Sequence, residues 1–154
     1  QDFRRRLLNH CTDSPRKMTV WLQDKLNEIY KKINQTKNKR PDNAPEPFDS
    51  WFETRVFHKI ASKGYQVISQ YEVSNYRIDM IIVGSKGRLA VECDGDHWHS
   101  GEEKEQQDLE RQWKLERCGW TFWRLRESVF NRNEEEALKS LWNLLDEMQI
   151  HPLG

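Results

Sequence analysis

Two acidic residues, Asp79 and Glu92, lie in neighbouring apolar segments that read as β-strands. Residues 84–87 (GSKG) between these segments are typical of a tight hairpin turn. A two-residue turn at Ser85 and Lys86 sets Asp79 directly opposite Glu92. Opposed side chains have Cβ atoms roughly 4.5–5.5 Å apart, so two like charges repel there. Burial raises that cost unless a proton or a cation is shared, and we therefore expect a divalent-metal site.

The same register sorts the rest of the hairpin into two faces. One face is wholly apolar, with three expected pairs: Ile78 with Cys93, Met80 with Val91 and Ile82 with Leu89. The other face carries the acidic pair together with two more expected pairs: Ile81 with Ala90 and Arg77 with Asp94. The carboxylates are therefore expected in front of an apolar layer.

The residue types around the pair indicate which cation and which reaction to expect. Oxygen-only ligands suit Mg²⁺ (or Mn²⁺), which completes its shell with waters and substrate phosphate. Such an ion polarises a phosphoryl group and lowers the pKa of a bound water, which is the chemistry of phosphodiester hydrolysis. A lone acidic pair is more often a solvated surface feature. Here the run 92–99 (ECDGDHWH) adds further acids and two imidazoles at a strand end, a usual place for a site.

Several motifs along the chain, taken together, resemble one known family. They are SWFETRVF, GYQV, YRIDMII, LAVECDGDHWH, DLERQ and LERCGWTFWRLR. This run resembles the PD-(D/E)XK (restriction-endonuclease-like) nuclease superfamily over about residues 48–150. Within it, the run is most similar to the very-short-patch-repair-like domain at the C-terminus of superfamily 1 DNA helicases. The segment RRRLLNH near the start is similar to the stretch that precedes that domain.

The resemblance implies a metal-dependent DNA endonuclease with the restriction-endonuclease-like fold. It implies DNA as substrate, Mg²⁺ or Mn²⁺ as cofactor and a helicase module in the same polypeptide. It also implies a role in bacterial defence against foreign DNA or in DNA repair.

Carried over residue by residue, the resemblance assigns Asp79 and Glu92 as metal ligands. It makes Glu53 the helix-borne acid that often completes the site. The chain departs from the pattern at Asp94, which stands where the family's E-x-K element has Lys. Asp94 is expected to assist the metal site, and another group must supply the positive charge or the base.

The candidates for that missing role follow the acidic strand. His99 is the candidate base and His97 a second one, as histidines are in the very-short-patch-repair relatives. Arg111 and Lys114 on the next helix could supply positive charge, so that Arg111 is expected to contact substrate. Trp98 is expected to stack on nucleic acid.

Each of these residues also has a purely structural interpretation. Glu53 could only complete a capping box with Ser50, and Asp94 could pair with Arg77 or cap the turn at Gly95. Asp108 and Arg111 could pair on a solvated helix face, and His99 could be a local packing residue. Core packing is the expected role of four tryptophans: Trp51, Trp113, Trp120 and Trp142.

Two alternative functions compete with the nuclease. The first is a catalytically silent nucleic-acid-binding module of the same fold, which Asp94 at the usual Lys position favours. The acidic pair counts against it, because a protein that only binds nucleic acid gains nothing from carboxylates that face phosphate. A zinc hydrolase using His97 and His99 lacks further Cys or His ligands at the usual spacing.

The elements that must position these residues follow from periodicity and from start and stop signals. We expect helices at 3–33, from Ser50 to Gly64, at 101–117 and at 134–148. Strands are expected at 65–73, 76–83, 88–94 and 120–126. This order predicts an α/β fold with a small mixed four-stranded sheet flanked by helices.

The proline-rich polar stretch 34–47 reads as a linker, which divides the chain into three parts. Residues 1–33 would be a basic helical tail of a preceding region, and residues 48–154 the nuclease domain. Since the chain begins with Gln1, we expect it to be a piece of a longer protein. Residues 1–47 hold 11 Lys and Arg against 6 Asp and Glu, while 48–154 hold 14 against 19. A basic arm beside an acidic domain is compatible with phosphate binding next to a metal site.

The remaining composition bears on the cellular compartment. No stretch approaches the roughly 18 apolar residues of a membrane span, and no signal peptide is visible. Three cysteines at unrelated spacings favour free thiols in a reducing compartment. We therefore expect an intracellular protein with no membrane partner, and the resemblance implies the bacterial cytoplasm. The sequence leaves the oligomeric state open.

Overall fold

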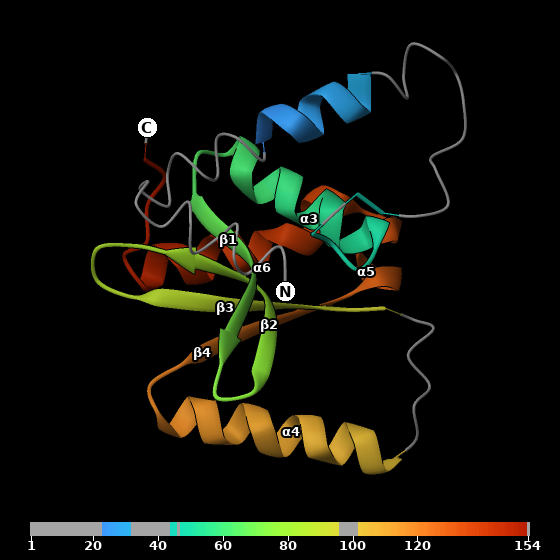
Figure 1. Cartoon of the computed structure of the whole chain (residues 1–154). Coiled ribbons are helices and arrows are strands. Elements are labelled where there is room, and N and C mark those ends of the chain that lie inside the picture. Colours follow the sequence, from blue (N-terminus) through green and yellow to red (C-terminus); the bar gives the residue numbers. More distant parts are fainter. Residues whose placement is uncertain (1–22, 32–43, 46, 96–101, 154) are drawn as a thin grey trace.

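A four-stranded sheet forms the centre of the computed structural model, which describes residues 23–31, 44–45, 47–95 and 102–153 (Figure 1). The strands lie in the order β1 (Gln66–Val73), β2 (Tyr76–Val83), β3 (Arg88–Asp94) and β4 (Thr121–Arg126). The first two pairings are antiparallel, whereas β3 and β4 run parallel. The predicted α/β class, with a small mixed sheet flanked by helices, is confirmed.

Helices cover both faces of this sheet. They are α3 (Trp51–Ser62), α4 (Glu102–Arg117), α5 (Glu127–Arg132) and α6 (Glu134–Glu147). In Figure 1, α3, α5 and α6 lie on one side of the sheet and α4 lies on the other. A parallel pair of strands needs a crossover connection, and α4 is the crossover that joins β3 to β4. This crossover brings β4 beside the acidic end of β3.

The ends of the helices follow the signals in the sequence. Ser50 is the N-cap of α3, and its hydroxyl accepts the Glu53 backbone N–H at 3.1 Å. Gly64 follows the C-cap of α3 with a positive φ of 92°, a conformation that glycine adopts without strain. Asn133 caps α6 by accepting the Glu136 backbone N–H at 3.1 Å. The six-residue helix α5 between β4 and α6 was not predicted.

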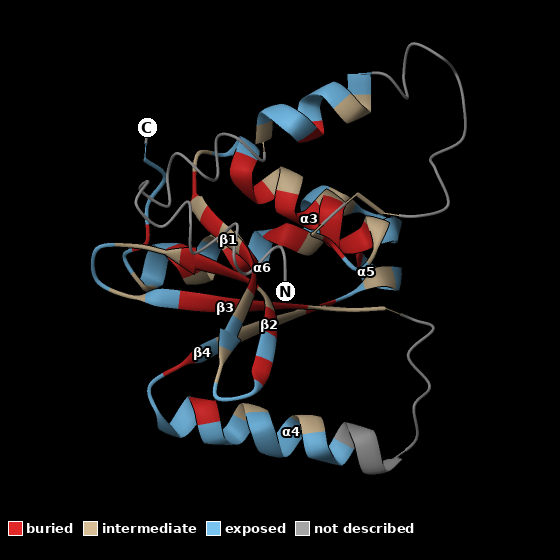
Figure 2. Ribbon diagram, in the orientation of Figure 1, coloured by how far each residue is buried: buried red, intermediate tan, exposed pale blue. Residues whose placement is uncertain are grey.

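The sheet divides the interior into two cores (Figure 2). The larger core lies between the sheet and the helices of the α3 side, and its fully buried members include Phe57, Ile60, Met80, Ile82, Leu89, Val91, Leu138 and Leu141. The smaller core is formed by the opposite face of the sheet with the end of α4: Tyr76, Ile78, Ile81, Ala90, Leu115 and Trp120. The site described below is formed by acidic residues of β2 and β3 and by the start of α3.

The hairpin of β2 and β3 has the predicted register. Four pairs are formed: Val83 with Arg88, Ile82 with Leu89, Ile81 with Ala90 and Met80 with Val91. The Gly84 N–H closes the turn by donating to the Gly87 carbonyl at 2.8 Å. The expectation that Ile78 shares the apolar face of Met80 is wrong, since Ile78 packs in the smaller core on the opposite face.

A local change in the β1–β2 ladder explains where Ile78 points. The register pairs the described strands at every position from Gln66 with Val83 to Val73 with Tyr76, except where Gln70 would meet Asp79. Gln70 has a positive φ of 53°, far from the extended conformation of a strand. Because the alternation of faces breaks at this point, Met80 and Ile78 face opposite cores.

The helix at residues 23–31 packs on α3. Leu26 is buried in the larger core, and the Tyr30 ring lies 4.7 Å from that of His58. The Gln23 amide donates to the Ser62 hydroxyl at 2.9 Å. The expected division of the chain at residues 33 and 48 stays a prediction, while these contacts show that helix 23–31 shares a core with α3.

The tryptophans differ in burial. Trp120 is buried, and Trp142 stacks on Tyr65 with ring centroids 5.6 Å apart. Trp113 is 56 % exposed on α4, so the expectation that it belongs to the core is wrong. Among the described helices, none is both long and apolar enough to span a membrane.

Candidate active site

Asp79 lies at the break in the β1–β2 ladder and contacts both neighbouring elements. Its Oδ2 accepts the Cys93 backbone N–H at 2.8 Å, which holds the carboxylate against β3. The Asp79 and Glu92 carboxyl groups line the same cavity, and the charge of Asp79 raises the pKa of Glu92. The two predicted ligands are therefore neighbours, although the predicted backbone pairing of Asp79 with Glu92 is not formed, because the ladder between β2 and β3 ends at Met80 with Val91.

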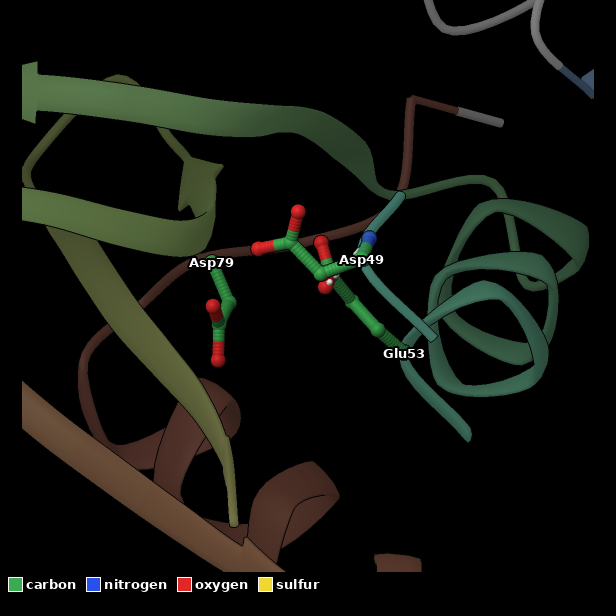
Figure 3. A group of neighbouring side chains, drawn as sticks. All are labelled: Asp49, Glu53 and Asp79. Atoms are coloured by element: carbon green, nitrogen blue, oxygen red, sulfur yellow. Dashed lines mark hydrogen bonds between the residues drawn. The ribbon is translucent and has the colours of Figure 1, made fainter. Parts of the chain in front are cut away.

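The first turn of α3 brings a second acidic group to Asp79. Figure 3 shows Asp49 and Glu53, at the start of this helix, facing Asp79 on the strand. One carboxylate oxygen from each of the three lies within 4.8 Å of the others, the one such group found in the described part of the chain. Asp49, which the sequence analysis did not single out, also binds the Arg77 guanidinium at 2.7 Å.

Glu53 takes part in the cap of α3, and its carboxylate also belongs to the acidic group, while its metal-binding role stays a prediction. The Ser50 hydroxyl accepts its backbone N–H, so Glu53 is part of the helix cap. Its Oε2 accepts the Asp49 backbone N–H at 3.3 Å, and its Oε1 accepts the side-chain amide of Gln70. The cap fixes the direction of the side chain and thereby places the carboxylate beside Asp79.

Two uncharged residues that the sequence analysis missed hold the acids in place. Gln70 donates from Nε2 to Glu53, and Tyr76 donates its hydroxyl to Glu92 Oε1 at 2.9 Å. Both residues are buried. The sequence could have indicated Gln70, because a hairpin turn at Ser74 and Asn75 sets it opposite Asp79 in the β1–β2 register. The sequence analysis did not assign that turn.

Burial raises the pKa values of Glu53, Asp79 and Glu92. Glu53 and Glu92 are 2 % and 7 % exposed. Burial, followed by the charge of Asp79, raises the pKa of Glu53 to about 8 and that of Glu92 to about 9. Burial also raises the pKa of Asp79, while the hydrogen bond from Cys93 lowers it. Without a cation, Glu53 and Glu92 therefore each hold a proton near neutral pH.

A cavity of about 340 Å³ opens beside Asp79 and Glu92. Its lining comes from β2, β3, β4, α4 and the β1–β2 turn: Asn75, Tyr76, Arg77, Asp79, Glu92, Cys93, Asp94, Gly95, Asp108, Arg111 and Arg124. Three of these residues are arginines, which are suited to binding phosphate oxygens. The predicted substrate residue Arg111 is one of them.

Arg124 lines the cavity on β4, the strand that pairs with the acidic strand β3. It stands opposite Glu92 in the parallel β3–β4 register. Its guanidinium lies 3.7 Å from the Asp94 carboxylate and 3.9 Å from that of Asp108, and it donates to Gln112 at 3.1 Å. The suggested pairing of Asp94 with Arg77 is therefore wrong, because Asp94 pairs with Arg124 and Arg77 with Asp49.

The donor atoms fit a small hard cation. Asp49, Glu53, Asp79 and Glu92 offer carboxylate oxygens, which Mg²⁺ and Mn²⁺ prefer. Opposite ligands of an octahedral Mg²⁺ are about 4.2 Å apart, twice its bond length of about 2.1 Å. Since the oxygens of the first three already lie within 4.8 Å, small side-chain rotations suffice to bind an ion. A bound dication would replace the protons of Glu53 and Glu92 and would compensate the negative charges of the ionised carboxylates.

Three predicted residues cannot be located. His97, Trp98 and His99 lie outside the described residues, so the predicted base and stacking roles stay predictions. Lys114 is exposed on α4. Of the candidates for the missing positive charge, Arg111 lines the cavity, and the structure adds Arg124, which the sequence analysis did not consider.

A comparison with protein families finds a match over most of the domain. The family model described as REase_MTES_1575, a restriction-endonuclease-like family, matches residues 52–145, more than half of the chain. The matched region includes Glu53, Asp79, Glu92 and Arg124, whereas Asp49 precedes it. No curated protein matches the chain.

Proposed function

Because the chain belongs to the restriction-endonuclease-like family REase_MTES_1575 and so to the PD-(D/E)XK nuclease superfamily, we propose that it hydrolyses DNA phosphodiester bonds with a divalent cation. The observation that carries the proposal is the position of Asp79, which lines one cavity with Glu92 and lies within reach of Glu53. Glu53 and Glu92 are buried, and unpaired charge is costly in such surroundings. A cation bound by them makes the arrangement favourable.

The proposed roles divide the site into a cation side and a phosphate side. Asp79 and Glu92, with Glu53, would hold Mg²⁺ or Mn²⁺, and Asp94 would assist from the end of β3. When bound, the cation polarises the phosphoryl group, activates a water and stabilises the leaving oxyanion. Tyr76 keeps Glu92 oriented through its hydroxyl.

Arg124 takes the part of the Lys that Asp94 replaces. Its guanidinium group lies on the cavity wall next to the acidic strand. Asp94 and Asp108 hold it from two sides and so fix its direction. Arg124, with Arg111 on α4, would bind the non-bridging oxygens of the phosphate that is attacked.

The wider setting is part of the same proposal. We propose that the chain is the nuclease part of a polypeptide with a helicase module, which would deliver or unwind DNA. Bacterial defence against foreign DNA, or DNA repair, in the cytoplasm would be its role. The resemblance to helicase-fused very-short-patch-repair-like domains supports this setting.

A cleavage assay with matched variants tests the proposal. The chain is incubated with supercoiled plasmid in Mg²⁺, Mn²⁺ or EDTA, beside Asp79→Ala and the control Asp146→Ala, which removes an exposed acid of α6. We expect cleavage that requires the cation, is lost in Asp79→Ala and is unchanged in Asp146→Ala. Equal cleavage by Asp79→Ala, or cleavage in EDTA, would contradict the proposal.

The alternative of a silent nucleic-acid-binding module predicts a different result in the same samples. Asp94 at the Lys position favours this alternative. Gel-shift measurements on the same DNA would then show binding by wild type without cleavage in either cation. That outcome would replace the nuclease with the binding module.

A further inference from the structure

Gln70 combines three properties that are unusual for a residue in the middle of a strand. It adopts a positive φ of 53°, which residues with a side chain rarely do. It is only 8 % exposed. Its Oε1 finds no hydrogen-bond partner among the described residues, although it is buried. Strained backbone and unsatisfied buried polar atoms both tend to mark functional positions.

The place of Gln70 links these properties to the acidic group. In the β1–β2 register it stands opposite Asp79, at the one position that the ladder leaves unpaired among the described residues. Its Nε2 donates to Glu53 Oε1. The two end atoms of an amide are about 2.2 Å apart, so Gln70 Oε1 lies within about 5 Å of the Glu53 carboxylate. The unsatisfied oxygen therefore lies beside the Glu53 carboxylate, which is one of the three that form the acidic group.

We propose that Gln70 completes the cation site, with its amide nitrogen fixing the Glu53 carboxylate and its amide oxygen offering a neutral ligand to the ion. The inference rests on the proposed function, since it presumes that the acidic group binds a divalent cation. Amide carbonyl oxygens are suitable ligands for hard cations and add no charge. A neutral oxygen is useful here, because the group already contains several carboxylates that repel one another.

The strained backbone belongs to the same arrangement. A residue in extended conformation at this position would project its side chain to the face opposite that of its neighbours. The positive φ of Gln70 interrupts the alternation, and from this point Tyr71 and Ile78 pack in the smaller core while Val67 and Met80 pack in the larger. The amide is thereby available to Glu53 on the α3 side.

The chain offers a matched control for testing Gln70. Gln149 is a second glutamine with a positive φ, 58°, and it is exposed after α6, where its Oε1 accepts Lys86 Nζ at 2.7 Å. Glycine adopts positive φ freely, so Gln70→Gly and Gln149→Gly both relieve backbone strain and remove an amide. Only the first removes an amide from the acidic group.

The experiment measures Mn²⁺ binding to the whole chain by isothermal titration calorimetry, with thermal unfolding as the check of folding. We expect Gln70→Gly to raise the dissociation constant for Mn²⁺ by about tenfold or more, while Gln149→Gly stays within about twofold of wild type. Gln70→Glu keeps an oxygen ligand at the same distance, so its dissociation constant should be no higher than that of wild type. Its stability without Mn²⁺ should fall, because it sets a second carboxylate against Glu53.

The outcomes separate this inference from the proposed function. If wild type binds Mn²⁺ and Asp79→Ala does not, but Gln70→Gly binds as wild type does, the role of Gln70 is overturned and the cation site stands. Loss of binding in Gln70→Glu as complete as in Asp79→Ala also overturns the ligand role, and this holds even if Gln70→Gly fails to fold. If wild type binds no Mn²⁺, the cation site and the role of Gln70 both fall.

Discussion

The substitution Glu92→Gln should make the metal-free protein less sensitive to rising pH. Glu92 is 7 % exposed, lines the same cavity as Asp79 and accepts the hydroxyl of Tyr76. Its pKa is raised from 4.5 to about 9 by burial and by the charge of Asp79. Glutamine has almost the same shape and cannot ionise, so the change removes the proton equilibrium while the packing is kept.

The sign and size of the effect follow from linkage. A carboxyl whose pKa is raised on folding contributes stability that is fully present below pH 4.5 and is lost as the pH rises towards 9. Between these values the unfolded chain has released the proton and the folded protein still holds it. Each pH unit then costs about 1.4 kcal/mol of unfolding free energy, or about 3 kcal/mol from pH 5 to pH 7. Glu92→Gln should avoid this loss.

Urea unfolding in EDTA at pH 5, 6, 7 and 8 measures the effect. The free-energy difference between Glu92→Gln and wild type should shift steadily in favour of the variant as the pH rises. Glu147→Gln, which neutralises an exposed acid at the end of α6, serves as the control for a general charge effect. A difference for Glu92→Gln that stays constant from pH 5 to pH 8 would show that Glu92 does not carry a raised pKa and would refute the reasoning.

Two further predictions concern the residues that contact the acids. Arg124→Gln should lower the cleavage rate at saturating Mn²⁺ on the order of 10²-fold. Calorimetry should show an Mn²⁺ affinity that is unchanged or higher, because the substitution removes a positive charge. A cleavage rate within about twofold of wild type would show that Arg124 does not bind the phosphate that is attacked. Tyr76→Phe deletes the hydrogen bond that favours ionised Glu92, so the pH profile of cleavage should move to higher pH; an unmoved profile would contradict that role.

The sheet was predictable because its determinants are local. The GSKG turn sets the register of β2 and β3, and three of the six predicted pairs are formed, with Val83 and Arg88 continuing the same register. The predicted pairs beyond Met80 and Val91 are not formed, because the ladder ends there. Helix caps at Ser50 and Asn133 depend on residues three positions apart, so they too can be read from short segments. The closeness of Asp79 and Glu92, which line one cavity, followed from this local register, while their role as metal ligands stays a prediction.

The surroundings of that pair were not predictable because they come from distant segments. Arg124 reaches the acidic strand only because α4 returns the chain so that β4 lies parallel to β3. Gln70 approaches Glu53 because its backbone departs from the strand conformation, which no residue pattern announced. The same departure turned Ile78 to the other core. Trp113 was expected in the core from its residue type, but it lies on the solvent side of α4.

Glu53 shows why structural and chemical interpretations of one residue need not compete. A cap residue has its side chain fixed by backbone hydrogen bonds, and that is also what a metal ligand needs. Here the Ser50 cap directs Glu53 back across the first turn of α3, where Oε2 accepts the Asp49 N–H and Oε1 accepts Gln70. The carboxylate is therefore in place before any ion binds. An ion entering between Glu53 and Asp79 displaces the proton of Glu53, and the order imposed by the cap lowers the cost of binding.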